Sequence, residues 1–261
     1  MPDIRAAFFD IDGTLLSHRT GRIPDSAIRA LMTLHEKGIL LFIATGRHFR
    51  EMQEVKDLLS LPWDGFVTLD GQYCRDREEA YFKNPLDRQD VENLIRCTEE
   101  MNISCMFVEE NEMYLNRSSE RVRKVQADIH LPPVPVRDLA RGVHTPVYLA
   151  ATYCSVREQE ELMKNLRFAR SARWHPFGYD IFHRDGGKDV GISKSCERFG
   201  FRPEETIAFG DSENDLELLV RAGIGVALGN AQDEVKAVSD MVTADIDDDG
   251  VEKALRALGL I

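Results

Sequence analysis

Phe8-Phe9-Asp10-Ile11-Asp12-Gly13-Thr14-Leu15-Leu16 is the stretch that decides the fold of this 261-residue chain. Apolar or small residues lead into it without alternation, which is typical of a strand buried on both faces. Asp10 and Asp12 then end the strand. Each charge loses hydration on burial and repels the other, so the pair predicts a cation or a basic residue beside it. An Asp-Gly hairpin turn is the alternative, but the residues after Leu16 make a poor return strand.

The composition is that of an ordinary globular protein, with 43% hydrophobic and 30% charged residues. A formal net charge of -12 argues against a nucleic-acid partner, and it means that lysine or metal must attract a phosphorylated substrate locally. No apolar run suits a membrane span, and residues 1–5 do not resemble a secretory signal. The five cysteines form no CxxC pair, which favours a reducing cytoplasm over zinc or disulfides. Monomer and dimer both stay open.

The first 82 residues alternate between apolar strands and helices. The predicted elements after the first strand are a helix over 24–37, a strand over 39–44, a helix over 48–59 and a strand over 64–69. This alternation is the signature of a parallel α/β sheet, whose ligands bind at the carboxyl ends of the strands. Asp10, Asp12 and Thr45 all lie at such ends.

From residue 83 to residue 185 the pattern changes to short strands mixed with polar helices. Helices are predicted over 85–101, 118–129 and 155–166, and strands over 103–108, 113–116, 147–153 and 179–183, with a proline-rich link over 131–136. The α/β pattern then resumes, with helices over 188–199, 213–222, 231–238 and 251–258 and strands over 206–209, 224–228 and 241–243. The sequence therefore predicts a Rossmann-like parallel-sheet core with helices on both faces, from residues 1–82 and 186–261. Residues 83–185 are expected to form an inserted α+β domain over the carboxyl ends of the strands.

Four motifs resemble, in order, those of the haloacid dehalogenase (HAD) superfamily. Residues 9–15 resemble the first motif, Ala44-Thr45-Gly46-Arg47 the second, Lys188 the third, and residues 210–215 the fourth. The insert between the second and third motifs is similar to the large α/β cap, of the C2 type, in the Cof-type group. This resemblance covers the whole core, and four motifs in order are far more specific than the first motif alone.

The resemblance implies a Mg²⁺-dependent phosphatase. Asp10 would be the nucleophile that forms an aspartyl-phosphate, and Asp12 the general acid and base. An Asp10 oxygen, the Asp12 backbone carbonyl and Asp211 would hold Mg²⁺, which prefers oxygen ligands, and Asp215 would support the metal directly or through water. The groups expected to bind phosphate are the amides of Ile11 and Gly46, the Thr45 hydroxyl, Lys188 and Asn214.

The expected substrate is a small phosphorylated metabolite, such as a sugar phosphate or a cofactor phosphate. Asp12 supports this expectation, because family members that cleave carbon–halogen or carbon–phosphorus bonds lack an acid/base aspartate there. A phosphomutase of the same superfamily is the near alternative. A signalling receiver module is disfavoured by the insert and by Asp12, which would speed loss of the phosphoryl group. A catalytically silent metal-binding protein is a third alternative, which is weak because every motif residue is present.

Three other features complete the expectations. Arg47 is interpreted as a surface residue at a helix start, or by family analogy as a phosphate contact. Asp70 stands where the resemblance predicts asparagine. The run from Asp245 to Gly250 matches half of an EF-hand loop, but Arg256 occupies the position of the required glutamate. We therefore interpret that run as a solvated acidic loop that caps the last helix.

Overall fold

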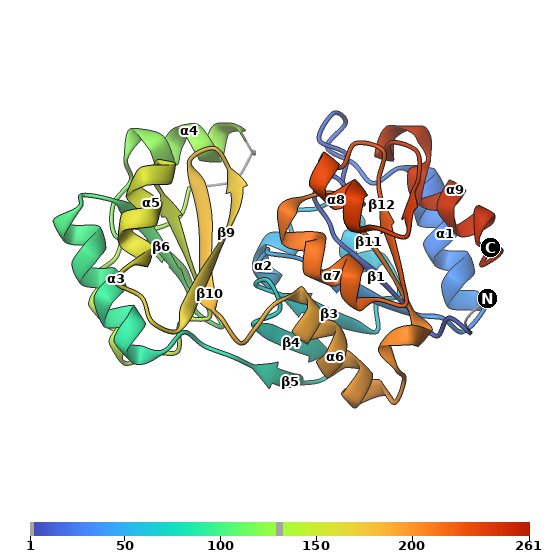
Figure 1. The fold of residues 1–261 in the computed structure, drawn as a ribbon, viewed down its shortest axis with the longest axis horizontal. Helices are drawn as coiled ribbons and strands as arrows, with labels where there is room; N and C mark the ends of the chain where they lie inside the picture. Colours follow the sequence, from blue (N-terminus) through green and yellow to red (C-terminus); the bar gives the residue numbers. More distant parts are fainter. Residues whose placement is uncertain (1–2, 129–132) are drawn as a thin grey trace. The chain divides into compact units, whose positions relative to one another are not determined.

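The computed structural model describes residues 3–128 and 133–261. The chain divides into two compact units, Met1–Phe82 with Gly186–Ile261 (unit 1) and Lys83–Asp185 (unit 2), as the colours of Figure 1 show. The expected segments over 1–5, 118–129 and 131–136 fall partly outside the described residues, at positions 1–2, 129 and 131–132. No helix among the described residues is long and apolar enough to cross a membrane.

Unit 1 is built on an eight-stranded sheet in the described part of the chain, with strand order β13-β12-β11-β1-β2-β3-β4-β5. The strands are β1 (Ala6–Phe9), β2 (Leu40–Ala44), β3 (Gly65–Thr68), β4 (Tyr73–Asp76), β5 (Ala80–Lys83), β11 (Thr206–Gly210), β12 (Ile224–Ala227) and β13 (Met241–Val242). Pairing is parallel from β13 to β3, and β4 runs antiparallel to β3. The predicted parallel-sheet core is confirmed, with an antiparallel extension at one edge.

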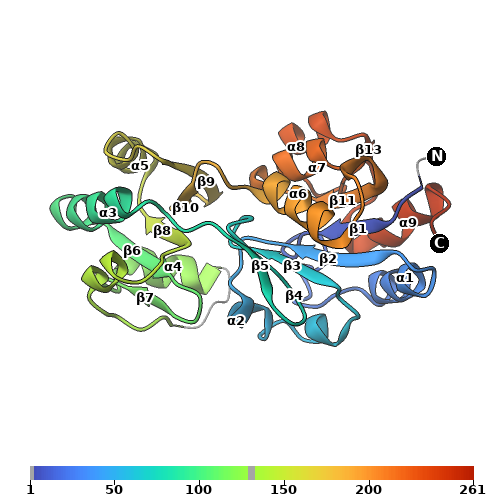
Figure 2. The ribbon, with the colours of Figure 1, turned by 90° about the horizontal axis from the view of Figure 1, so that it is seen from below.

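Helices cover both faces of this sheet, as predicted. Alternate residues of β1 point to opposite sides, so Phe9 joins one core cluster and Phe8 the other. The helices on the Phe9 side are α1 (Asp25–Glu36) and α9 (Gly250–Ala257), and those on the Phe8 side are α6 (Lys188–Phe199), α7 (Leu216–Arg221) and α8 (Asp233–Val238). Figure 2 shows α6, α7 and α8 above the sheet and α1 below it.

One expectation for unit 1 is wrong, and a second holds only in part. The helix predicted over 48–59 is only α2 (Phe49–Met52), followed by turns and a 3-10 turn (Leu58–Ser60) that begins after Asp57, whose φ of 65° is left-handed. Met52, Val55 and Leu58 of this stretch are buried, so core packing rather than helix formation explains their spacing. The acidic loop supplies Asp249 as the N-cap residue of α9, but without a capping bond from its side chain, and Asp247 bonds to Ser17 and Arg19.

Unit 2 contains a five-stranded sheet of order β7-β6-β8-β10-β9 among its described residues. Its strands are β6 (Ser104–Val108), β7 (Met113–Leu115), β8 (Leu149–Tyr153), β9 (Ala169–His175) and β10 (Gly178–His183). The helices are α3 (Arg88–Glu100), α4 (Glu120–Asp128) and α5 (Val156–Met163). Apolar residues of α3 and α5 pack with Phe107, Ala150 and Ile181 in one core. Strand β9 was not predicted, because its residues are mostly half-exposed and carry no clear apolar period.

Candidate active site

Three strand ends meet at one edge of the unit 1 sheet. In the register of the sheet, Phe9 at the end of β1 lies opposite Phe209 of β11 and Ile43 of β2. Asp10, the next residue, donates its N–H to the Phe209 carbonyl at 3.1 Å. The first, second and fourth motifs are therefore neighbours because parallel strands begin and end together.

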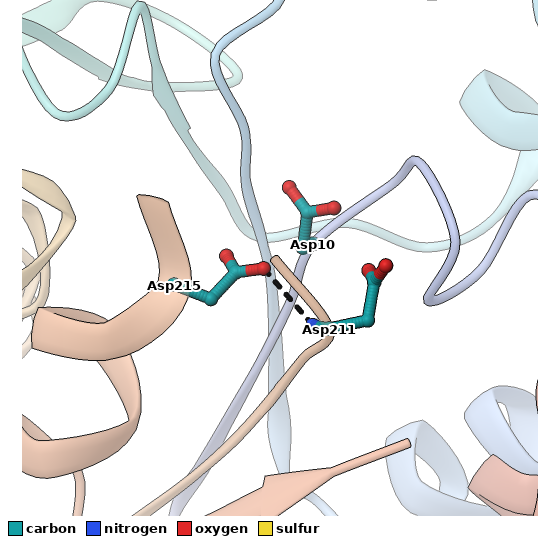
Figure 3. A group of neighbouring side chains, drawn as sticks. All are labelled: Asp10, Asp211 and Asp215. Carbon is teal, nitrogen blue, oxygen red and sulfur yellow. Dashed lines mark hydrogen bonds between the residues drawn. The ribbon is translucent and has the colours of Figure 1, made fainter. Parts of the chain in front are cut away.

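Asp10, Asp211 and Asp215 bring three carboxylates together at this edge (Figure 3). One oxygen of each lies within 4.8 Å of the others. Lys188, at the first turn of α6, donates from Nζ to Asp10 Oδ1 at 2.8 Å and to Asp215 Oδ1 at 2.7 Å. Asp215 Oδ2 accepts the backbone N–H groups of Asp211 and Ser212 at 3.0 and 3.1 Å. Lys188 is thus the basic residue that the opening stretch requires.

One lysine does not offset all the negative charge of this cluster. Burial raises the pKa of the Asp10 carboxyl well above its ordinary value in spite of Lys188. Burial and the charge of Asp215 raise the pKa of Asp211 to about 7. Burial opposes the charge of Lys188, yet Asp10 and Asp215 hold its pKa above the ordinary value. The carboxylates therefore favour a further positive charge.

The groups at this edge fit a hard divalent cation. Asp10 and Asp211 each keep one carboxylate oxygen, Oδ2, without a hydrogen bond from the described residues, since Lys188 and Thr14 bond to Oδ1. The Asp12 carbonyl likewise receives no hydrogen bond from the described residues. Two carboxylates and a carbonyl are oxygen donors of the kind Mg²⁺ prefers. Both oxygens of Asp215 are already bonded to protein groups, which suits a supporting position.

Asp12 lies outside the carboxylate cluster and pairs with Arg47. Arg47 Nε donates to Asp12 Oδ2 at 2.7 Å and Arg47 Nη2 donates to Asp12 Oδ1 at 2.6 Å, a bidentate arrangement. The Arg47 side chain is 16% exposed, so its interpretation as a surface residue is wrong. Although burial opposes its charge, the bonds to Asp12 raise the pKa of Arg47. The two aspartates of the first motif thus have different surroundings.

Backbone N–H groups gather beside Asp10. Those of Ile11, Asp12 and Gly46 have no acceptor among the described residues. Thr45 is buried, and its Oγ1 accepts the Arg47 N–H at 3.1 Å, which leaves the hydroxyl proton available to donate. Unbonded amides in a loop form an anion site, so this edge also suits phosphoryl oxygens.

Asn214 is held between two neighbours. Its Nδ2 donates to Asp70 Oδ1 at 3.1 Å, and its Oδ1 accepts the Ser212 hydroxyl at 2.7 Å. The amide nitrogen carries two protons, so one remains for a phosphoryl oxygen. Asp70, which departs from the expected asparagine, therefore contacts a predicted site residue.

Two residues of the site were not predicted. Thr14 donates from Oγ1 to Asp211 Oδ1 at 2.8 Å, and Asn230 donates from Nδ2 to the Gly13 carbonyl at 2.8 Å. A signal existed for each in the sequence. Thr14 lies within the first motif, and Asn230 follows the carboxyl end of another parallel strand, β12.

The haloacid dehalogenase-like hydrolase family matches residues 7–255 of this chain. The chain is 28% identical over 263 residues to the pyridoxal phosphate phosphatase of Escherichia coli (strain K12), covering 95% of this chain and 96% of the relative. It is 27% identical over 263 residues to a 5-amino-6-(5-phospho-D-ribitylamino)uracil phosphatase of Bacillus subtilis (strain 168), covering 95% and 94%.

The fold is also similar to solved structures. A sugar phosphatase of HAD subclass IIB superposes with a TM-score of 0.91 at 36% identity, covering 98% of this chain and all of the other. A phosphatase of the same superfamily from Bacteroides thetaiotaomicron also gives a TM-score of 0.91, at 30% identity over 99% of this chain and 96% of the other.

Proposed function

This chain belongs to the haloacid dehalogenase-like hydrolase family, and from that premise we propose that it is a magnesium-dependent phosphatase working through an aspartyl-phosphate on Asp10. It is a hydrolase of that family, and relatives that match 95% or more of its length are named as phosphatases. The substrate class that we propose is a small phosphorylated metabolite, such as a sugar phosphate or a cofactor phosphate.

The observation that carries the proposal is the contrast between Asp10 and Asp12. Asp10 is 4% exposed and lies in the carboxylate cluster beside Lys188, whereas the Asp12 side chain is 37% exposed and lies outside it. Two carboxylates one residue apart in different surroundings suit two different roles. Asp10 is fixed for attack on phosphorus, and Asp12 is placed where a leaving alcohol and then water can reach it.

The reaction then has two steps. A carboxylate oxygen of Asp10 bonds to phosphorus while the ester P–O bond breaks, and the Asp12 carboxyl gives its proton to the leaving oxygen. Next, the Asp12 carboxylate takes a proton from water, which attacks phosphorus and breaks the bond to Asp10. Arg47 contributes by holding the Asp12 carboxylate in one orientation through two hydrogen bonds.

The oxygens of Asp10, the Asp12 carbonyl and Asp211 would hold Mg²⁺, and Asp215 would position Asp211 through the Asp211 N–H. The bound ion neutralises charge on the transferring phosphoryl group. The amides of Ile11 and Gly46 and the Thr45 hydroxyl bind phosphoryl oxygens. Lys188 offsets the charge on Asp10 and on the phosphate, and Asn214 donates its second amide proton.

Unit 1 is the catalytic part in this proposal, because every residue named above belongs to it. Unit 2 supplies none of them. We assign unit 2, the expected cap, to the choice of phosphate ester rather than to the chemistry.

The test is phosphate release from a panel of sugar phosphates and cofactor phosphates, with Mg²⁺ and with EDTA. The wild-type protein is expected to release inorganic phosphate from some esters, only with the metal. Asp10→Asn is expected to release none. It should remain folded, because asparagine is close to aspartate in size and Lys188 keeps its bond to Asp215 at 2.7 Å.

Asp240→Asn is the matched control, since Asp240 contacts the Gly225 N–H at 2.8 Å in the same unit and lies outside the site. It is expected to keep wild-type activity. Undiminished turnover by Asp10→Asn would remove Asp10 as the nucleophile. Formation of an isomeric phosphate without free phosphate would replace hydrolysis by a phosphomutase reaction.

A further inference from the structure

The turn from Asp12 to Leu16 is fastened by a side chain 217 residues further along the chain. Asn230 Nδ2 donates to the Gly13 carbonyl at 2.8 Å, and Asn230 Oδ1 accepts the Ile246 N–H at 3.0 Å. The orientation of the amide is fixed by these partners, because a carbonyl can only accept and a backbone N–H can only donate.

Asn230 is itself held in place by its own loop. The Gly229 N–H donates to the Ala244 carbonyl at 2.9 Å. A Cβ added to Gly229 would lie 2.5 Å from the Asp245 nitrogen, so the two backbones approach as closely as they can. The position of the Asn230 side chain is therefore set by the packing of two loops.

The bond to Gly13 completes the constraint on the turn. The Gly13 N–H donates to the Leu16 carbonyl at 3.0 Å, which fixes the peptide between Asp12 and Gly13. In a trans peptide the carbonyl points away from the N–H, so the Asp12 carbonyl faces away from Leu16. Asn230 fixes the next peptide, between Gly13 and Thr14. Both peptides of Gly13 are thus held in one orientation.

This turn lies directly against Asp211. A Cβ on Gly13 would be 2.3 Å from Asp211 Oδ2, and Thr14 donates to Asp211 Oδ1 at 2.8 Å. A rotation of the peptides around Gly13 would therefore displace both the Asp12 carbonyl and the hydroxyl that orients Asp211. The Asp12 carbonyl and Asp211 are the proposed ligands of Mg²⁺ that would be disturbed.

We propose that Asn230 is a positioning residue for the cation site, which it serves by fixing the Gly13 carbonyl. The proposal rests on the proposed function only in taking the Asp12 carbonyl and Asp211 as metal ligands. If Asn230 only stabilised the fold, its loss would have a small effect, because Asn230 is exposed and water can replace its hydrogen bonds. Loss of such a bond would leave the affinity for metal unchanged.

The experiment measures Mn²⁺ binding by electron paramagnetic resonance to the full chain, without substrate. Asn230→Ala is expected to weaken binding about tenfold or more, as removal of groups that orient metal ligands generally does. Asn230→Asp keeps an acceptor for the Ile246 N–H but loses the donor to Gly13. It also adds negative charge near the cation, which alone would strengthen binding. We expect weaker binding in this variant as well.

Thr243→Val is the matched control. It removes the hydrogen bond from Thr243 Oγ1 to the Gly250 carbonyl, 2.8 Å long, from the same loop region without touching Gly13. Its Mn²⁺ affinity is expected to equal that of the wild type. Wild-type affinity in both Asn230 variants would overturn the proposal.

Hydrogen exchange of the metal-free proteins supplies a second measurement. The Gly13 and Leu16 amides are expected to exchange faster in both Asn230 variants, and the amides of β12 at the wild-type rate. Unchanged exchange at Gly13 would also contradict the proposal. Both measurements are made without turnover. A wild-type protein that binds Mn²⁺ but hydrolyses no ester would refute the proposed activity and leave this inference standing.

Discussion

Lys188 is the only basic side chain inside the carboxylate cluster of the described residues, and Lys188→Met tests how much the core depends on it. Its Nζ lies 2.8 Å from Asp10 and 2.7 Å from Asp215, and all three side chains are buried. At an effective dielectric constant of about 20, each pair gains about 6 kcal/mol of Coulomb energy, most of which offsets desolvation. Removing one partner leaves buried charge unpaired and costs about 3–5 kcal/mol.

The assay is urea unfolding in EDTA, with Trp63 as the probe of unit 1. The other of the two tryptophans, Trp174, belongs to unit 2 and is replaced by phenylalanine in all variants. With a denaturant slope of about 2 kcal/mol/M, the loss corresponds to a midpoint about 1.5–2.5 M lower. Mg²⁺ is expected to restore part of this difference, because it replaces positive charge in the cluster.

Lys194→Met is the control on the same helix. Lys194 pairs with Glu197 at 2.8 Å, but the two side chains are 35% and 66% exposed, so its loss should cost less than about 1 kcal/mol. Equal midpoints for Lys188→Met and Lys194→Met would refute the reasoning. That result would mean that the carboxylates are neutral or solvated in the folded protein.

Two further predictions concern Arg47 and pH. Arg47→Lys replaces a bidentate guanidinium by a single ammonium. We therefore expect kcat to fall about tenfold to a hundredfold, with a smaller change in KM. An equal loss of kcat in Arg50→Lys, a variant in the same segment, would contradict this. Folding raises the pKa of Asp211 to about 7, so the folded protein binds a proton there more tightly than the unfolded chain does. The contribution of Asp211 to the free energy of unfolding is therefore complete below about pH 4 and is lost as the pH rises through 7. Urea midpoints in EDTA should therefore fall between pH 5 and 8 by more than they do in Mg²⁺; parallel pH profiles in the two solutions would rule out this origin.

The parts of the fold that could be predicted are those in which burial imposes a regular pattern. Strands β1, β2 and β11 are buried on both faces and appear in the sequence as uninterrupted apolar runs. Strand β5 is mostly half-exposed at a sheet edge, so its residues carry little apolar signal. The helix predicted over 48–59 failed for the opposite reason. Met52, Val55 and Leu58 are buried by an irregular chain, which a periodic pattern cannot distinguish from a helix.

The site was predictable where residue type and strand position coincide. Asp10, Thr45 and Asp211 each follow a strand, and the sheet register brings those ends together. The contacts of Arg47 and Asn214 were not predictable, because they depend on side-chain directions. Arg47 turns toward Asp12 rather than toward solvent, and Asn214 bonds to Asp70. Neither pairing has a signature in residue spacing.

The central pairing of β1 with β11 also determines when the site can exist during synthesis. Thr14 and Asp211, which bond to each other, are 197 residues apart, and all of unit 2 lies between them. At about 5–20 residues per second, a ribosome needs about 10–40 s to pass from one to the other. Throughout that interval Asp10 has been made but Asp211 has not, and Lys188 is also missing for most of the time. A nascent chain can therefore assemble this site only after all of unit 2 has been made.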